Sequence, residues 1–176
     1  MIQNLIVSHH HSNKMRRIAQ EMSAEDCNLL LQEQNMAVLG MIDKDGNPYT
    51  VPITYAHDKV NNTIIFHGAS QGKKFDILTS GTNVHMTIVG YNEVDKVVMT
   101  TKYKSVMITG KIELLTGGNK WKESILRFTE QLTEGVNHEE TEMNNYLEKA
   151  EKRLAVYLVH IDSISGKQSR HFVSQK

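Results

Sequence analysis

Two adjacent lysines follow a glycine-rich corner, and their setting indicates an anion site. Lys73 and Lys74 come directly after residues 68–72, where small side chains let a ligand approach the backbone closely. The apolar pattern over 75–78 predicts a short helix, so both lysines fall in its first turn. Cations there oppose the helix dipole by about 0.3–1 kcal/mol each, whereas a phosphate bound at the same end would stabilise them. The alternative is that both lysines are simply solvated on a surface helix.

The chain carries none of the short motifs of metal-dependent or nucleophilic catalysis. HExxH, CxxC, GxSxG and GxxxxGK[ST] are all absent from the sequence. His9, His10 and His11 could bind a metal, but adjacent histidines in a polar segment are more typical of an incidental run or a tag remnant. We interpret His85 as a surface or hydrogen-bonded histidine and Cys27 as a packing residue, because nothing nearby would stabilise a thiolate. No functional metal site is therefore predicted.

Composition limits the class of protein. Twenty basic residues balance twenty acidic ones, so the chain lacks the positive charge expected of a nucleic-acid-binding protein. A single cysteine excludes an internal disulfide and favours a reducing compartment. No apolar run approaches the roughly 20 residues of a membrane span, and residues 1–7 lack the charged flank of a secretion signal. We expect a cytoplasmic protein with no nucleic-acid or membrane partner.

The elements that must position the lysines follow from periodicity. Residues 63–66 are β-branched or aromatic and follow an Asn-Asn turn, so a strand leads into the glycine corner. Residues 36–42 and 49–55 predict two further strands joined by an Asp-Gly turn. Pro52 lies inside the second of them and cannot donate to a sheet, so one side of that strand stays unpaired. Such a strand is either a plain edge or a place where a flat ligand pairs with the backbone.

The remaining elements complete a small barrel. We expect strands over 84–91, 104–115 and 154–164, helices over 23–31, 118–133 and 139–152, and a polar connection over 92–101. Trp121 belongs to an apolar stripe on the second of these helices, which indicates a core or dimer contact. About six hairpin-connected strands predict a mainly β fold, a small antiparallel barrel with peripheral helices. We expect residues 1–22 to form an N-terminal arm and residues 23–176 a single domain.

Several segments, taken in order, resemble one known group of proteins. These are MRR at 15–17, VPITY at 51–55, FHGASQGKKFD at 66–76, TKYKSVMITGK at 101–111 and GKQ at 166–168. They resemble the nitroimidazole-resistance (Nim) flavoproteins, within the pyridoxamine 5'-phosphate oxidase-like superfamily of FMN-binding split barrels. The resemblance covers residues from about 15 to 170, and its blocks are specific in combination rather than singly.

The resemblance implies a six-stranded antiparallel split β-barrel that forms a homodimer, with a flavin in each of two clefts at the interface. FMN is the expected flavin, and FAD is also compatible with the sequence. Residues 51–55 would run beside the isoalloxazine ring, residues 66–69 along the ribityl chain, and the two lysines at the phosphate. The implied cofactor-binding residues are Val51, Pro52, Ile53, Thr54, Tyr55, Phe66, His67, Gly68, Ala69, Gly72, Lys73, Lys74, Ser105 and Val106.

The activity implied by the resemblance is flavin-dependent reduction of a 5-nitroimidazole antibiotic at its nitro group to an amine. His67 would be the catalytic residue, because a histidine beside the flavin can place or protonate a nitro oxygen. The alternative is that His67 only packs against the neighbouring chain. Two other functions stay open: a flavin- or haem-binding split-barrel protein without turnover, and a flavin oxidoreductase that acts on another small metabolite.

Overall fold

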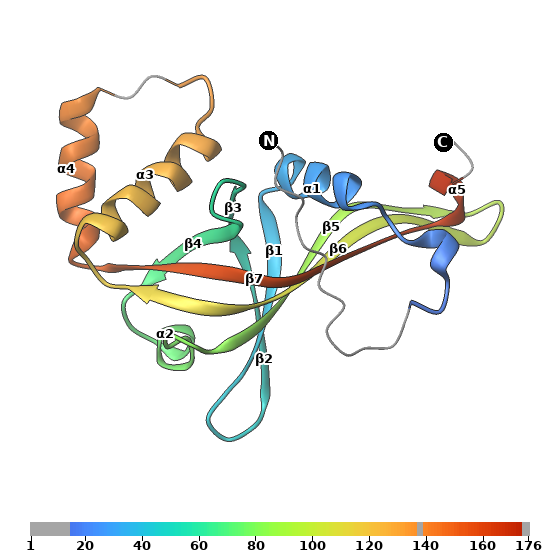
Figure 1. Ribbon diagram of the computed structural model, residues 1–176, viewed down its shortest axis with the longest axis horizontal. Coiled ribbons are helices and arrows are strands. Elements are labelled where there is room, and N and C mark those ends of the chain that lie inside the picture. Colours follow the sequence, from blue (N-terminus) through green and yellow to red (C-terminus); the bar gives the residue numbers. More distant parts are fainter. Residues whose placement is uncertain (1–14, 137–138, 174–176) are drawn as a thin grey trace.

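The computed structural model describes residues 15–136 and 139–173, and Figure 1 shows a single twisted sheet with helices around it. The His9-His10-His11 run lies outside the described residues. The strands are β1 (Met36–Ile42), β2 (Pro48–Thr54), β3 (Ala56–Asp58), β4 (Thr63–Ala69), β5 (Asn83–Asp95), β6 (Thr100–Leu115) and β7 (Leu154–Gln168). The helices are η1 (Ile18–Gln20), α1 (Ala24–Glu33), α2 (Lys73–Ile77), α3 (Asn119–Leu132), α4 (Glu140–Glu151) and α5 (Arg170–Val173).

The sheet has the order β2-β1-β5-β6-β7-β4-β3, and each pair of neighbouring strands is antiparallel. The predicted class, mainly β with peripheral helices, is therefore confirmed. The predicted count of six strands is wrong, because the described chain forms seven. The additional strand β3 has only three residues, too few to show the two-residue period by which strands are found in a sequence.

Two apolar clusters pack on opposite faces of β4. Phe66 belongs to the main core inside the curled sheet, whereas its neighbour Ile65 packs with α3 and α4 on the other side. Successive side chains of a strand point to opposite faces, so β4 is covered on both. Trp121 is fully buried in the second cluster, and its indole N–H donates to the Leu154 carbonyl at 3.1 Å. The apolar stripe on α3 therefore belongs to the core, which is one of the two roles predicted for it, a core contact or a dimer contact.

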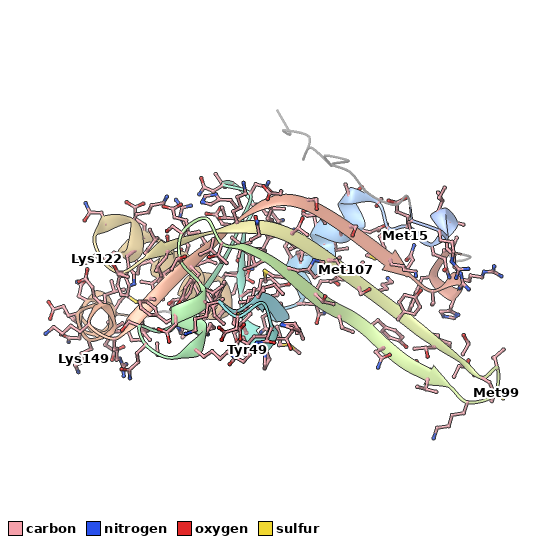
Figure 2. The ribbon with its side chains drawn as sticks, turned by 90° about the horizontal axis from the view of Figure 1, so that it is seen from below. Met15, Tyr49, Met99, Met107, Lys122 and Lys149 are labelled. Atoms are coloured by element: carbon pink, nitrogen blue, oxygen red, sulfur yellow. The ribbon has the colours of Figure 1, made fainter. Side chains whose placement is uncertain are left out.

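The predicted polar connection over 92–101 is wrong, because β5 and β6 continue through it as a paired ribbon that turns between Asp95 and Thr100. Figure 2 shows Met99 at the far end of this ribbon. Lys102 bridges Glu93 at 3.4 Å and Asp95 at 3.3 Å. These strand residues are mostly charged or polar, so the apolar pattern that marks a half-buried strand is missing from the sequence.

The described part of the N-terminal arm packs on the sheet. Gln20 and Met22 are buried, and the Met22 N–H donates to the Gly166 carbonyl at 2.9 Å. Ser23 then caps α1, because its hydroxyl accepts a hydrogen bond from the Asp26 N–H at 3.1 Å. Cys27 on α1 is buried, and burial raises the pKa of its thiol to about 11, which agrees with a packing role. Within the residues described, no helix is long and apolar enough to span a membrane.

Candidate functional site

β2 is an edge strand, as Pro52 predicts. It is the last strand of the sheet and pairs only with β1, where Pro52 lies opposite Val38. Side chains alternate along it, so Ile53 is buried while Pro52 and Thr54 are exposed, and Val51 packs against the core. Tyr55, directly after the strand, points inward and donates its hydroxyl to the Leu31 carbonyl at 3.1 Å. A ligand beside 51–55 would therefore meet backbone and small side chains, not the Tyr55 hydroxyl.

β4 divides the predicted site residues between its two faces. Phe66 is fully buried and stacks on Tyr157 of β7, with ring centroids 4.7 Å apart. His67 points to the opposite face, where its ring meets Phe128 of α3 edge-on at 4.8 Å. Burial and the nearby Lys74 ammonium lower the pKa of His67. His67 is thus half-buried against α3 and held as a neutral imidazole over a wider pH range than usual.

Lys74 occupies the space that the missing side chain of Gly68 leaves. A Cβ atom added to Gly68 would fall 2.7 Å from Lys74 Nζ, and the same Nζ lies 5.8 Å from the centre of the Phe66 ring. Burial lowers the pKa of Lys74. Among the residues that the structure describes, no carboxylate forms an ion pair with it. A half-buried ammonium without a counterion is the strongest anion-attracting feature of this corner.

Lys73 lies beside Lys74 in the chain but has a different environment. Its Nζ is 3.2 Å from Asp43 Oδ2, in the turn between β1 and β2, and 4.6 Å from the centre of the Tyr49 ring. The pKa of Asp43 is lowered, first by the Asn47 backbone N–H and also by Lys73. The charge of Lys73 is therefore already balanced within the chain, and the two lysines are not equivalent.

No sequence pattern predicted Tyr157, Asp43 or Tyr49 at this corner. Tyr157 lies next to Gly68, since the added Cβ would be 3.9 Å from its ring. Its buried hydroxyl has no hydrogen-bond partner in the described chain, and burial raises the pKa of that hydroxyl to about 12. An orphaned hydroxyl, an unpaired ammonium and a glycine-lined gap together fit a polar, anionic group such as a flavin phosphate.

Ser105 and Val106 do not join this corner within one chain. Tyr157 pairs with Phe66 on one side and with Leu114 of β6 on the other, so Leu114 marks the level of the corner on β6. Ser105 lies nine residues before Leu114, roughly 30 Å away at about 3.3 Å per residue. Val106 is buried in the core, while Ser105 lies on the outer face of the sheet.

The corner does not belong to any of four cavities that lie elsewhere in the described chain. The best-formed cavities of the described chain include these four of about 50 to about 500 Å³, and neither Phe66, His67 nor Lys74 lines any of the four. One of them reaches β2 at Thr50, on the outer face of the sheet.

Residues 23–168 match the sequence profile of the pyridoxamine 5'-phosphate oxidase family. The chain belongs to this family. A relative of uncharacterized function from Rhizobium meliloti strain 1021 is 27% identical over 128 residues, which cover 73% of this chain and 68% of the relative. The family assignment agrees with the resemblance inferred from the motifs at 51–55, 66–76 and 101–111.

Solved structures share the fold of this oxidase-family chain. A candidate 5-nitroimidazole antibiotic resistance protein from Bacteroides thetaiotaomicron is similar with a TM-score of 0.68 and 20% identity, over 92% of this chain and 95% of that one. An FAD- and haem-binding protein from Mycobacterium smegmatis has a TM-score of 0.67 at 17% identity, over 86% and 73%. A flavocytochrome from Azotobacter vinelandii has a TM-score of 0.69 at 19% identity, over 89% and 72%. Likenesses at these identities establish the fold.

Proposed function

We propose that the protein is a flavin-dependent reductase of the 5-nitroimidazole-resistance type, a cytoplasmic homodimer that reduces a nitro group to an amine. The observation that carries the proposal is Lys74, whose half-buried ammonium lies over Gly68 without an ion-pair partner in the described chain. It faces a corner between the open edge of β2 and the end of β4. An ammonium so placed needs an anion, and a flavin phosphate meets that need in a family of flavin oxidases.

FMN is the flavin we propose. Lys74 would hold the phosphate, the edge backbone of β2 would pair with the flavin ring, and residues 66–69 would follow the ribityl chain. FMN carries one phosphate, which matches a corner where Lys74 is unpaired and Lys73 is balanced by Asp43. FAD would need only further room beyond that phosphate. When bound, the flavin supplies electron transfer, and the protein contributes binding, orientation and electrostatics.

The homodimer is supported by the outer face of the sheet, defined here by the side chains of β1, β2, β5 and β6 that alternate away from the core. These are Met36, Val38, Gly40, Ile42, Thr50, Pro52, Thr54, His85, Thr87, Val89, Ser105, Met107 and Thr109. None of these is an acid, a lysine or an arginine, although Lys111 and Glu113 continue the same alternation on β6 beyond Thr109. Met36, Val38, Ile42 and Val89 are exposed. An exposed apolar face of this kind is typical of a protein–protein interface. A second copy on it would bring Ser105 towards the corner that one chain leaves open.

His67 is the residue we propose to act on the substrate, from the α3 face of β4, opposite to the face on which Lys74 and Tyr157 line the corner. Its lowered pKa keeps the imidazole neutral at neutral pH, so it can donate one hydrogen bond and accept another. A nitro oxygen beside it would be oriented by that donor. As the oxygen gains charge, the ring could give it this proton while its second nitrogen takes up one from water, so the imidazole stays neutral. Because burial and Lys74 lower the pKa of His67, the ring becomes protonated only below neutral pH, and we expect the part of the activity that depends on His67 to change only there.

A second function is favoured by two of the structural neighbours. One of these proteins binds FAD and haem, and another is a flavocytochrome. On this alternative the chain binds a flavin or haem without reducing a substrate. A third function, a flavin oxidoreductase with another small metabolite as substrate, uses the same corner and differs only in what His67 meets.

The deciding experiment begins with the absorption spectrum, flavin content and mass of the purified protein. We expect a yellow dimer with about one FMN per chain. The chemically reduced protein is then mixed with a 5-nitroimidazole without oxygen. Because the amine takes six electrons and each reduced FMN supplies two, the flavoprotein is present in more than threefold excess over the drug. Loss of nitro absorbance is followed for wild type and His67→Ala. We expect His67→Ala to keep flavin and to reduce the drug roughly 10²-fold more slowly per flavin.

Each other result has its own meaning. A colourless protein that does not bind added FMN contradicts the flavin site. A sharp absorption band typical of a bound haem favours the haem-binding alternative. Flavin without any nitro reduction by wild type leaves a binding protein or a reductase of another metabolite. Equal rates for wild type and His67→Ala would limit His67 to packing against Phe128.

A further inference from the structure

A pocket of about 500 Å³ lies beside β6 at the place where β7 ends. β7 stops at Gln168, opposite Lys104, whereas β6 already begins at Thr100, so the first part of β6 has a free edge on this side. η1 and α5 pack together next to that edge, as Figure 1 shows near the C-terminus. The pocket, here called the arm pocket, is therefore lined by the N-terminal arm, the β5–β6 ribbon and α5.

The lining of the arm pocket carries more positive than negative charge. Arg17, Lys102 and Arg170 supply three cationic side chains, and Asp95 supplies the one carboxylate of the lining. That carboxylate is already engaged, because it accepts two backbone N–H groups of the ribbon turn at 3.0 and 3.1 Å and pairs with Lys102 at 3.3 Å. Within the residues described, no carboxylate forms an ion pair with Arg17. The pocket should therefore attract an anion.

Two buried polar side chains that line the same pocket have unused hydrogen-bonding groups. Gln20 is 4% exposed and Ser169 is 7% exposed, and both line the arm pocket. Gln20 Oε1 and Ser169 Oγ have no hydrogen-bond partner in the described chain, whereas buried polar atoms are nearly always paired. The serine hydroxyl can donate to an anion, and the amide oxygen can accept from a hydroxyl or an N–H group. The pocket therefore suits a ligand that carries both an anionic group and a hydrogen-bond donor.

We propose that the arm pocket binds the phosphate group of a small hydroxylated molecule, a nucleotide or a sugar phosphate. The guanidinium of Arg17 would pair with the phosphate, for which its planar fork of N–H donors is well suited. Ser169 would donate to the same phosphate, and Gln20 would accept from a hydroxyl of the ligand. A volume of about 500 Å³ is typical of a small-molecule site and exceeds what a bare phosphate ion fills.

This site is separate from the proposed flavin site. All the residues of the arm pocket belong to one chain, and none of them is among the residues that the family resemblance assigns to the flavin. The site also gives a role to the MRR segment at 15–17, which the flavin proposal does not use. The proposal therefore does not rest on the proposed function, and the two can fail independently.

The first test is a calorimetric titration of the protein as purified, with any flavin that it holds. The ligands are AMP, ribose 5-phosphate, inorganic phosphate and adenosine. We expect AMP or ribose 5-phosphate to bind more tightly than inorganic phosphate, and adenosine, which has no phosphate, not to bind. Added KCl should weaken the binding, because salt screens the attraction between the cationic lining and the phosphate. The comparison of AMP with ribose 5-phosphate distinguishes a nucleotide from a sugar phosphate.

The second test changes Arg17 and its neighbour in the chain. Arg17→Ala removes a charged hydrogen-bond donor, so we expect the affinity for the phosphorylated ligand to fall roughly tenfold to a hundredfold. Arg16→Ala is the matched control, because Arg16 is also exposed and carries the same charge but does not line the pocket. The control should bind like wild type. Arg17→Lys keeps the charge without the planar fork and should recover part of the affinity.

The third test separates ligand binding from a structural role. Ser169→Ala removes a hydroxyl that has no partner in the described chain, so the melting temperature without ligand should not fall. The affinity for the phosphorylated ligand should nevertheless fall several-fold, because one donor to the phosphate is lost. A lower melting temperature with unchanged affinity would assign the hydroxyl to the fold and contradict its role in the site.

The outcomes separate the arm pocket from the flavin site. Binding that is lost in Arg17→Ala and kept in both Arg16→Ala and Lys74→Glu supports the proposal, whether or not the protein holds flavin. If wild type binds neither AMP nor ribose 5-phosphate, or binds adenosine or inorganic phosphate equally well, the proposal is overturned. Loss of AMP binding in Lys74→Glu but not in Arg17→Ala also overturns it, because AMP would then occupy the corner at Lys74.

Discussion

The two ends of the sheet differ in how far a single chain completes them. At the Lys74 end, defined by Phe66, Gly68, Lys74 and Tyr157, side chains stack, pack and line a corner within one chain. At the Ser105 end, on β6 beside Val89 and about 30 Å away, the outer face is exposed and has no partner in the described chain. Residues that the family resemblance assigns to one cleft are thus distributed over both ends. In the dimer that we propose, a complete cleft would combine the Lys74 end of one copy with the Ser105 end of another.

The largest effect should come from reversing the charge at the Lys74 end. Lys74→Glu removes a charged hydrogen bond worth roughly 1.5–3 kcal/mol and adds repulsion, so we expect FMN affinity to fall by at least tenfold to a hundredfold. Lys73→Glu should cost less, because Asp43 already balances Lys73. Fluorescence titration with FMN measures both variants. Riboflavin, which has no phosphate, is the control ligand and should bind all forms alike.

Neither variant should unfold the protein, because a glutamate suits the start of a helix better than a lysine does. Thermal melts without flavin check this point. If both variants bind FMN as wild type does, the lysines are only solvated and the Lys74 end is not a phosphate site. Equal losses in both variants would contradict the difference that we draw between Lys73 and Lys74.

The next largest effect should appear when the two ends are damaged in separate chains. Ser105→Glu puts a carboxylate on the outer face, and we expect it to lower FMN binding by about tenfold or more, as an unpaired charge in an interface is costly. Co-expression of Lys74→Glu chains with Ser105→Glu chains should then restore binding in part. Mixed dimers would hold one undamaged cleft, so about a quarter of all clefts recover in a random mixture.

This recovery distinguishes a shared cleft from a cleft within one chain. If all flavin contacts came from one chain, each chain of a mixed dimer would remain defective and no binding would return. Mixing the two purified variants after refolding, with each variant alone as the control, measures the recovered fraction. If no FMN binding returns, the cleft is not shared between the Lys74 end of one chain and the Ser105 end of another.

Much of the Lys74 end could be predicted from the sequence because it is local. The strand before the corner, the small residues and the short helix follow each other within about fifteen residues, so each leaves a pattern that its neighbours reinforce. The open edge at Pro52 follows from the absence of an N–H in one residue. These features needed no knowledge of distant contacts.

The parts that the sequence did not predict depend on contacts between distant residues. Asp43 and Lys73 are thirty positions apart and meet only because the β1–β2 turn reaches α2. Tyr157 reaches Gly68 through the pairing of β4 with β7. The paired ribbon beyond Val89 was not predicted, because its charged strand residues form ion pairs with one another and do not pack against a core. The periodicity of a single sequence indicates which residues are buried against a core, but it does not show which distant residues contact one another.

A smaller effect should appear in the pH dependence of FMN binding. Burial lowers the pKa of Lys74, so its ammonium loses a proton at a lower pH than an exposed lysine. The charged form holds the phosphate, hence affinity should fall as pH rises through that lowered pKa. Lys74→Arg stays charged throughout this range and should flatten the alkaline fall. A fall of the same size in wild type and Lys74→Arg would assign the pH dependence to another group.

The smallest effect should come from one added methyl group. Gly68→Ala places a Cβ 2.7 Å from Nζ and 2.9 Å from Cε of Lys74, but these atoms are the far end of a flexible side chain. Lys74 can swing into solvent, so we expect a change in the free energy of unfolding within about 0.5 kcal/mol. The ammonium then leaves the corner, and FMN affinity should fall only a few-fold.

A double-mutant cycle tests whether that loss acts through Lys74. In a Lys74→Ala protein no ammonium is left to displace, so adding Gly68→Ala should lower FMN affinity no further. If the two losses add, the methyl group instead blocks the ribityl path along β4, and Gly68 contacts the flavin directly. If Gly68→Ala lowers the melting temperature sharply, Lys74 is wedged too firmly to move, and the corner is a rigid structural contact instead of a site that adapts to a phosphate.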